Sequence, residues 1–287
     1  MHPDVLARPT TVTFPAGALR ADARVLTVQG GVVVTDVTPF HPVDHTWPDQ
    51  PGDSGTIVVG ADEVAVAEAV MAAISDDGAF AVGTDIPVKR GAEGWTWLVG
   101  HRVEGEIPAS ITAGASAALE VDEVRRAGLS RGHTACHLAS LALDLALADL
   151  WRKDPGADAL GSPDFEGRAN QTSFIHVDGA VDEYRLGKSL RKAGFDSETF
   201  AATVAEREAA INATLASWVA SGAPSRIVTD GPTIIDMRRW ECELPAGTAS
   251  IPCGGTHAAS LAEFASITVS LVLQDQLLTM TTSAVAA

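Results

Sequence analysis

Short runs of β-branched and apolar residues, separated by turn residues, fill the first hundred positions of the chain. These runs predict strands at residues 11–14, 24–28, 32–35, 55–59, 80–82 and 95–99. Gly30-Gly31 is typical of a hairpin turn, while residues 64–74 fit a strand, a helix or one after the other. A small antiparallel β-barrel is the natural way to close so many short strands.

After residues 108–118, which are rich in Ala, Ser and Gly, longer periodic segments replace the short runs. A helix is predicted over residues 130–152, up to Asp154-Pro155-Gly156, and a second over 197–220, up to Ser221-Gly222. Alternation predicts further strands at residues 172–177, 226–229, 234–244 and 266–273. The mixture of helices and strands indicates an α+β class.

Length and composition allow two domains. A chain of 287 residues is long enough for two ordinary hydrophobic cores, and 46% hydrophobic residues indicate a globular protein. The change of pattern therefore predicts an N-terminal β-barrel domain over residues 1–110 and an α+β domain over residues 111–287.

The sequence carries no signal of secretion or membrane insertion. The first residues lack the basic and apolar regions of a signal peptide, and Asp144 and Asp149 interrupt the longest apolar stretch. Three cysteines, an odd number, give no disulfide framework, and Cys136 and Cys242 are expected to be small buried residues. We expect a soluble cytoplasmic protein.

The net charge of −17 argues against broad, nonspecific binding of nucleic acid, because a strongly acidic protein repels polyanions. Local basic groups are nevertheless present in three parts of the chain. They are Arg125, Arg126 and Arg131; Arg185, Lys188, Arg191 and Lys192; and Arg238 with Arg239. Each group is either a local basic strip or a set of scattered, solvated charges.

Two pairs of metal-binding residues are each spaced by four positions. On a helix, His133 and His137 would point two imidazoles from one face at the same ion. Cys253 and His257 add a thiolate and an imidazole, and Gly254-Gly255 lets the backbone bend beside the ion. Three histidines and one cysteine suit zinc best, since the donors are borderline-soft and of tetrahedral number.

Either pair alone could be a chance spacing on a helix surface, but two pairs in one chain favour a metal site. A metalloprotease of the HExxH type is disfavoured because Thr134 stands where that motif has its glutamate. The two pairs are far apart in the sequence, which favours a site in a folded cleft over a small zinc-knuckle module.

The segment Arg131-Gly-His-Thr-Ala-Cys-His-Leu-Ala139 resembles the HTAxHLL segment of the alanyl-tRNA synthetase editing-domain family, which includes the freestanding AlaX-type trans-editing proteins. Cys253-Gly-Gly-Thr-His257 matches the CGGTH signature of that family. Thr38-Pro-Phe40 and Gln50-Pro-Gly-Asp-Ser-Gly55 resemble its TxFY, GGQ and GDxG blocks, although Trp47-Pro48-Asp49 replaces the Gly-Gly before the glutamine.

The resemblance implies an N-terminal β-barrel followed by an editing domain of the type common to threonyl- and alanyl-tRNA synthetases. Its activity would be zinc-dependent hydrolysis of the ester that joins serine or glycine to tRNA for alanine. The zinc would lie in a pocket for the acceptor end of the tRNA. Since the chain has no room for an aminoacylation domain, the protein would act in trans.

Gln50 and Thr134 are the candidate substrate-binding or catalytic residues. The amide of Gln50 can donate to and accept from a substrate hydroxyl or amine, although the residue could equally lie exposed on a loop. Thr134 lies between the two histidines and could bind a serine hydroxyl, or it could cap or pack. His41, His45 and His176 lack ligand spacing and are expected to be surface or structural residues.

Three other functions fit the same residues. A zinc hydrolase of a small amino-acid or acyl substrate would explain the acidic charge and the altered loop before Gln50. A non-catalytic relative would hold a structural zinc with all four ligands closed around it. A cysteine hydrolase using Cys253 and His257 is the weakest of these, because the HxxxH motif beside them fits a metal better.

Overall fold

The computed structural model describes residues 8–287, which fold into two compact units of mixed α and β structure. Unit 1 comprises residues 8–126 with Ile227–Arg238 and Gly254–Thr256. Unit 2 comprises Ala127–Arg226, Arg239–Cys253 and His257–Ala287. The division into domains at residues 1–110 and 111–287 stays a prediction.

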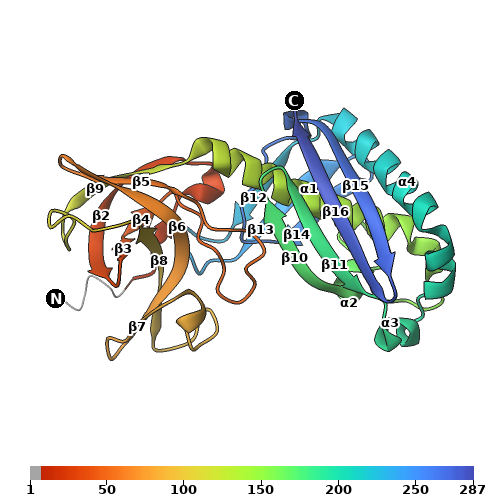
Figure 1. Ribbon diagram of the computed structural model, residues 1–287, viewed down its shortest axis with the longest axis horizontal. Helices are drawn as coiled ribbons and strands as arrows, with labels where there is room; N and C mark the ends of the chain where they lie inside the picture. The colour runs from red at the N-terminus through yellow and green to blue at the C-terminus, as the bar shows by residue number, and fades with distance from the viewer. Residues whose placement is uncertain (1–7) are drawn as a thin grey trace. The chain divides into compact units, whose positions relative to one another are not determined.

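Unit 1 is built on a closed antiparallel barrel (Figure 1). Within the described residues its strands are β2 (Arg20–Gln29), β3 (Val32–Thr35), β5 (Gly55–Val59), β6 (Asp62–Ser75), β8 (Trp95–Val103) and β9 (Ser116–Val121). They pair in the order β5-β9-β2-β3-β8-β6. Strand β5 also pairs with β6, and this pairing joins the first strand to the last and closes the barrel. The small antiparallel barrel predicted from the sequence is thereby confirmed.

The remaining elements of unit 1 extend this barrel. Strand β7 (Phe80–Val82) pairs with β6, and β1 (Thr11–Val12) pairs in parallel with β4 (Val37–Thr38). Short 3-10 turns lie at Phe14–Ala16 and Gly83–Asp85. The ambiguous residues 64–74 are a strand, because β6 pairs with β5 on one edge and β8 on the other. Gly30 and Gly31 both have positive φ, as the predicted hairpin turn requires.

Unit 2 has a four-stranded antiparallel sheet in the order β10-β11-β16-β15 within the described residues. These strands are β10 (Asn170–His176), β11 (Gly179–Arg185), β15 (Phe264–Gln274) and β16 (Leu277–Ala286). Its helices are α1 (Glu123–Ala146), α2 (Glu166–Ala169), α3 (Lys188–Ala193) and α4 (Ser197–Ser221). A smaller sheet holds β12 (Ser225–Thr229), β13 (Arg238–Leu244) and β14 (Gly247–Pro252), of which residues 227–229 and 238 are counted in unit 1.

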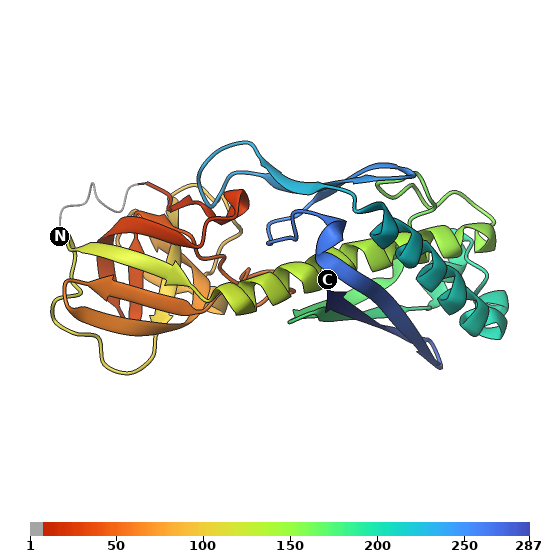
Figure 2. The ribbon, with the colours of Figure 1, turned by 90° about the horizontal axis from the view of Figure 1, so that it is seen from above.

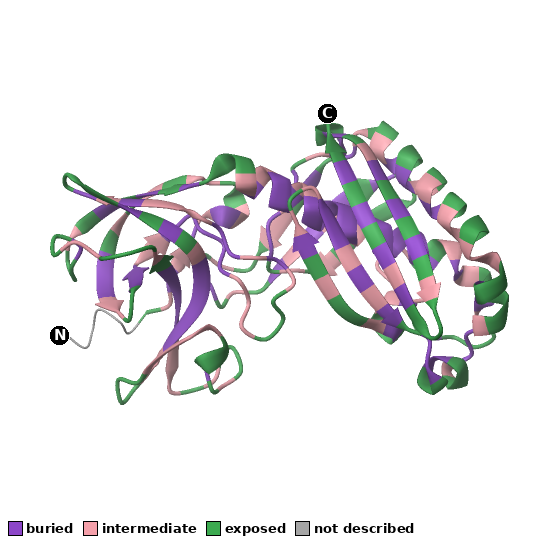
Figure 3. Ribbon diagram, in the orientation of Figure 1, coloured by how far each residue is buried: buried purple, intermediate pink, exposed green. Residues whose placement is uncertain are grey.

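Helix α1 runs between these two sheets (Figure 2), and its apolar face joins them in one core. The fully buried residues of this core include Leu138 and Ala142 of α1, Trp240 of β13 and Met280 of β16. Figure 3 shows the alternation of buried and exposed residues along the strands. Gly132 permits the closest approach, since a Cβ at this position would lie 2.3 Å from the carbonyl oxygen of His176.

Helix α4 protects the edge of the four-stranded sheet. The side chain of Asn212 accepts from the N–H of Val269 at 2.8 Å and donates to the Val269 carbonyl at 3.0 Å, while Glu208 accepts from the N–H of Leu271. These contacts satisfy backbone groups that an edge strand would otherwise leave open. The predicted helix at 197–220 is confirmed, and it begins at the N-cap Asp196 and ends at Gly222.

Some predicted boundaries are wrong. The first helix begins at Glu123 rather than 130, because Asp122 caps its first turn, and it ends at Ala146 before a 3-10 turn at Ala148–Leu150. The predicted strand at 234–244 begins only at Arg238, because Thr233–Asp236 forms a turn held by the Asp236 carboxylate. A last 3-10 turn lies at Leu261–Glu263.

Candidate metal centre

Four side chains of unit 2 converge where α1 passes the end of β14. His133 and His137 lie one turn apart on α1, Cys253 directly follows β14, and His257 lies four residues further on. One donor atom from each residue lies within 4.8 Å of every other. The sulfur of Cys253 is 3.4 Å from Nε2 of His133 and 3.3 Å from Nε2 of His257. The residues that the sequence proposed as ligands therefore lie together.

The two sulfur–nitrogen separations are close to those around a tetrahedral zinc ion. With Zn–S of about 2.3 Å and Zn–N of about 2.0–2.1 Å, neighbouring sulfur and nitrogen ligands lie roughly 3.5 Å apart. The observed sulfur–nitrogen distances of 3.3 and 3.4 Å are close to this value. The donor set is consistent with zinc.

His137 supplies independent support for a metal. Its Nε2 is buried and has no hydrogen-bond partner in residues 8–287. Burial also lowers the pKa of His137 to about 4, so the imidazole is neutral at physiological pH and its nitrogen lone pair is available. A buried, neutral nitrogen aimed at two other imidazoles and a thiol is what a metal ion would satisfy.

An aromatic wall encloses the histidines on one side. The indole of Trp240, which is fully buried on β13, lies with its ring centre 5.3 Å from that of His137 and 5.5 Å from that of His257. The centres of the His133 and His257 rings are 4.4 Å apart. The indole therefore encloses the His137 and His257 rings on one side. Trp240 could not be identified from the sequence, because only the pairing of β13 with β14 brings it to the site.

Thr134 lies behind His257. Its hydroxyl is fully buried, 3.2 Å from Nδ1 of His257, and it accepts the N–H of Ala258 at 3.0 Å. An imidazole that binds a metal through Nε2 carries its proton on Nδ1, so in the metal-bound state Nδ1 donates to Thr134. A metal on Nε2 would set the tautomer of His257, and the contact with this hydroxyl would hold the direction of the ring. The possible contact of Thr134 with substrate stays a prediction.

Gln50 of unit 1 holds the segment between the two C-terminal ligands. Its amide nitrogen donates to the Thr256 hydroxyl at 2.8 Å, and its amide oxygen accepts the Thr256 N–H at 3.0 Å. Both residues are buried, so Gln50 is not an exposed loop residue. Thr256 directly precedes His257 in the chain. The amide thus restrains the Gly254–Thr256 segment, and its role toward substrate stays a prediction.

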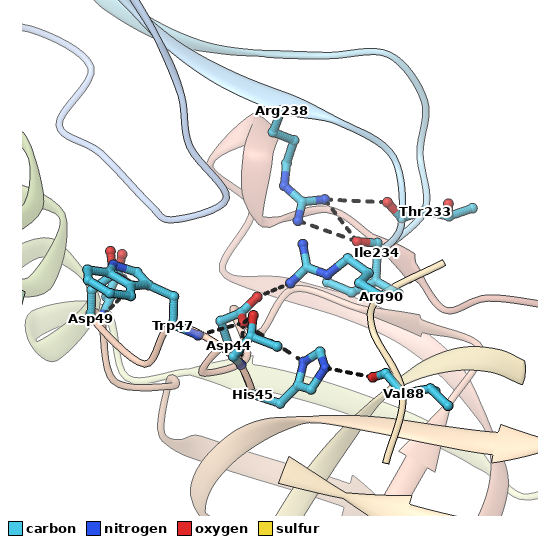
Figure 4. A network of polar contacts seen from close by, with 11 residues as sticks. Asp44, His45, Trp47, Asp49, Val88, Arg90, Thr233, Ile234 and Arg238 are labelled. Carbon is cyan, nitrogen blue, oxygen red and sulfur yellow. Dashed lines mark hydrogen bonds and ion pairs between the residues drawn. The ribbon is translucent and has the colours of Figure 1, made fainter. Parts of the chain in front are cut away.

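The loop before Gln50 is folded around Asp44 (Figure 4). The Asp44 carboxylate accepts from the backbone N–H of Thr46 and Trp47 and pairs with Arg90, and these contacts lower its pKa against the opposing effect of burial. His45 lies beside it, with a side chain only 3% exposed. His41 is also buried. Both histidines are structural rather than surface residues.

The block around Gly52 and Asp53 anchors the start of α1 within unit 1. Arg126, on the first turns of the helix, donates Nε to the Asp53 carboxylate at 2.9 Å and also donates to the Pro39 carbonyl. Asp53 in turn accepts the N–H of His41. All of these groups are buried, so removing one partner would leave an uncompensated charge. Asp53 therefore has a structural role that spacing alone did not indicate.

The remaining cysteines have the predicted character. Cys136 and Cys242 are both buried, and burial raises the pKa of the Cys242 thiol to about 11. Within residues 8–287 no helix is long and apolar enough to cross a membrane. No protein-family model matches the sequence, and no curated protein matches it either.

Proposed function

We propose that this protein is a zinc-dependent hydrolase that acts in trans on mischarged aminoacyl-tRNA, removing serine or glycine from tRNA for alanine. The observation that carries the proposal is the convergence of His133, His137, Cys253 and His257 from two distant segments. The same segments carry the sequence motifs that resemble the alanyl-tRNA synthetase editing family, to which we propose that the chain is related.

His133, His137, Cys253 and His257 would hold the metal. A bound zinc ion would supply Lewis acidity toward the ester carbonyl and lower the pKa of an attacking water. The protein itself sets the direction of the ligands. Thr134 orients His257, Trp240 forms an apolar wall, and Gln50 restrains the Gly254–Thr256 segment between two ligands. His137, Cys253 and His257 are only partly buried.

The net negative charge of the chain favours one alternative, a hydrolase of small acyl substrates. A net charge of −17 weakens attraction to a polyanion, and it would suit a zinc hydrolase whose substrate is a small amino-acid ester, amide or other acyl compound. This alternative predicts turnover without tRNA. A non-catalytic zinc protein would instead retain four closed ligands and show no turnover of any acyl substrate.

The test is deacylation of tRNA for alanine charged in turn with serine, glycine and alanine. Zinc-loaded protein is compared with Cys253→Ala and with Cys242→Ala, a buried cysteine outside the cluster. Selective loss of Ser or Gly that depends on Cys253 and not on Cys242 supports the proposal. Equal rates for the metal-free and zinc-loaded protein would refute the mechanism, and activity on small esters alone would favour the alternative.

A further inference from the structure

Two of the three basic groups in the sequence are engaged in contacts inside the protein. In the first, Arg125 donates to the Gly52 carbonyl, Arg126 pairs with Asp53, and Arg131 pairs with Asp178. In the third, Arg238 lies over the ring of Phe14, and Arg239 pairs with Glu241. These arginines serve the fold, and they do not form a free basic surface.

The middle group is different. Arg185, Lys188, Arg191 and Lys192, here called the α3 patch, are all exposed. Their side chains form no hydrogen bond or ion pair with any other residue of the range 8–287. The stretch from Tyr184 to Phe195 contains no acidic residue. Four unpaired positive charges in twelve residues stand out in a chain of net charge −17.

The fold gathers these charges at one end of unit 2. Lys188, Arg191 and Lys192 are spaced i, i+3 and i+4 on α3, so they share one face of this short helix. Arg185 ends β11 just before it. Figure 3 shows α3 as a largely exposed turn of chain beyond the sheet.

Two further cations lie beside α3. The N–H of Arg152 donates to the Gly194 carbonyl at 2.9 Å, and Lys153 donates to the Lys192 carbonyl at 3.0 Å. Gly194 makes this approach possible, since a Cβ there would lie 2.9 Å from the backbone nitrogen of Lys153. Lys153 thus adds positive charge beside α3, whereas the guanidinium of Arg152 is paired with Asp196.

A pocket of about 380 Å³ adjoins the patch. Arg152, Arg191 and Ser197 line it, and the buried Ser197 hydroxyl has no hydrogen-bond partner in the described chain. Guanidinium and hydroxyl donors suit phosphate oxygens. Three acidic residues, Asp196, Glu198 and Asp275, also line the pocket. The carboxylate of Asp196 is paired with Arg152 at 2.5 Å, and Glu198 and Asp275 are exposed to solvent.

We propose that the α3 patch binds the phosphate backbone of the tRNA whose charged end reaches the metal centre. The identity of this RNA rests on the proposed function. From His137, α1 continues for nine residues to Ala146, about 14 Å at the helical rise of about 1.5 Å per residue. At roughly 3.4 Å of rise per nucleotide of a duplex strand, that distance corresponds to several nucleotides. An RNA with its end at the histidines and its strand running along α1 would extend past the C-terminal end of this helix, from which Arg152 and Lys153 lead to α3.

The test uses uncharged tRNA, so that binding is measured without chemistry. Fluorescence anisotropy at several salt concentrations compares wild type, K188Q/R191Q/K192Q and the control R20Q/K89Q/R102Q. Both variants remove three positive charges, the control residues are exposed, and glutamine preserves helix propensity in α3. Zinc content and circular dichroism show that each variant is folded.

We expect the α3 variant to bind about tenfold or more weakly than wild type, and its dependence of log K on log salt to be shallower by roughly 2–3. The control should stay close to wild type. Equal binding by all three proteins, or no binding by wild type at low ionic strength, overturns the proposal. Patch-dependent binding of poly-glutamate without binding of RNA also overturns it and indicates an acidic protein partner.

Deacylation measured with the same proteins separates the two proposals. Patch-dependent binding of tRNA without any deacylation would leave the RNA surface standing and remove the proposed reaction. Deacylation with an unchanged KM in the α3 variant would leave the proposed reaction standing and remove the RNA surface. Hydrolysis with a KM raised by the α3 substitutions and not by the control supports both.

Discussion

Replacing Thr134 with valine tests whether its hydroxyl orients a metal ligand. Valine has nearly the same shape and removes only the hydroxyl, which accepts from Ala258 and lies 3.2 Å from Nδ1 of His257. Because the Thr134 side chain is fully buried, water cannot replace these contacts. We expect the Ala258 N–H to lose its partner in every state of the protein, whereas the His257 contact matters most when a metal is bound.

The magnitude follows from these two losses. An unsatisfied buried donor costs about 1–3 kcal/mol, so the metal-free variant should lose about that much stability. Loss of a hydrogen bond to a metal-binding histidine typically reduces metal affinity by about 10–100-fold, which corresponds to about 1.4–2.8 kcal/mol. The difference between wild type and variant should therefore be larger with zinc than without it.

The assay combines urea unfolding, with and without zinc, and competition with a zinc chelator. Thr134→Ser keeps the hydroxyl and should restore most of the zinc affinity. Thr282→Val is the matched control, because Thr282 is also fully buried but its hydroxyl has no hydrogen-bond partner in residues 8–287. It should change neither the zinc affinity nor, to any large extent, the stability.

An unchanged zinc affinity for Thr134→Val, with a stability loss that is the same with and without zinc, would refute the reasoning. Thr134 would then be a packing residue that caps Ala258. Equal loss of zinc affinity in the Thr134→Val and Thr282→Val variants would likewise show that the effect is general to the core and independent of the His257 contact.

Four further outcomes are expected. Gln50→Leu, which deletes both bonds to Thr256, should weaken zinc binding about tenfold, whereas Gln29→Leu, outside the site, should not; chelator competition measures both. Cys253→Ala should lose bound zinc by elemental analysis, while Cys242→Ala retains it. Removal of zinc with a chelator should lower the melting temperature of wild type more than that of Cys253→Ala. Burial raises the pKa of Asp144 to about 8. Native protein therefore holds this proton more tightly than unfolded protein, and stability falls as pH rises from about 4 to 8. Asp144→Asn, whose amide oxygen can still accept from Phe165 and Glu166, should flatten that part of the curve in urea unfolding. If the stability of Asp144→Asn changed with pH as steeply as that of wild type, Asp144 would not be the group responsible for the pH dependence.

Local pattern predicted many of the elements because their signals are short-range. Residues 32–35, 55–59 and 80–82 are strands with the predicted bounds, and α4 follows its apolar period and its caps closely. Strand β9 was not predicted. It begins inside the stretch rich in Ala, Ser and Gly, yet Ala117, Leu119 and Val121 alternate inward once β2 and β5 pair with it on either side.

Burial decided several roles that residue type left open. Gln50, an amide in a loop segment, is buried because Thr256 satisfies both ends of its side chain. His41 and His45 are enclosed by the fold of unit 1. Three basic groups looked alike in the sequence, and only the positions of carbonyl and carboxylate partners separated the engaged arginines from the exposed α3 patch.

The sequence by itself determined the identity of the candidate metal ligands, because helical spacing places His133 and His137 on one face and Gly254-Gly255 permits a tight bend after Cys253. It also determined the α+β class through its periodicity. Only the tertiary structure decided that the two ligand pairs meet, that Trp240 walls the site and that Thr134 lies behind His257. The contacts of His133 with Cys253 and of Thr134 with His257 join residues more than a hundred positions apart, and no local propensity encodes which distant segments a shared core will bring together.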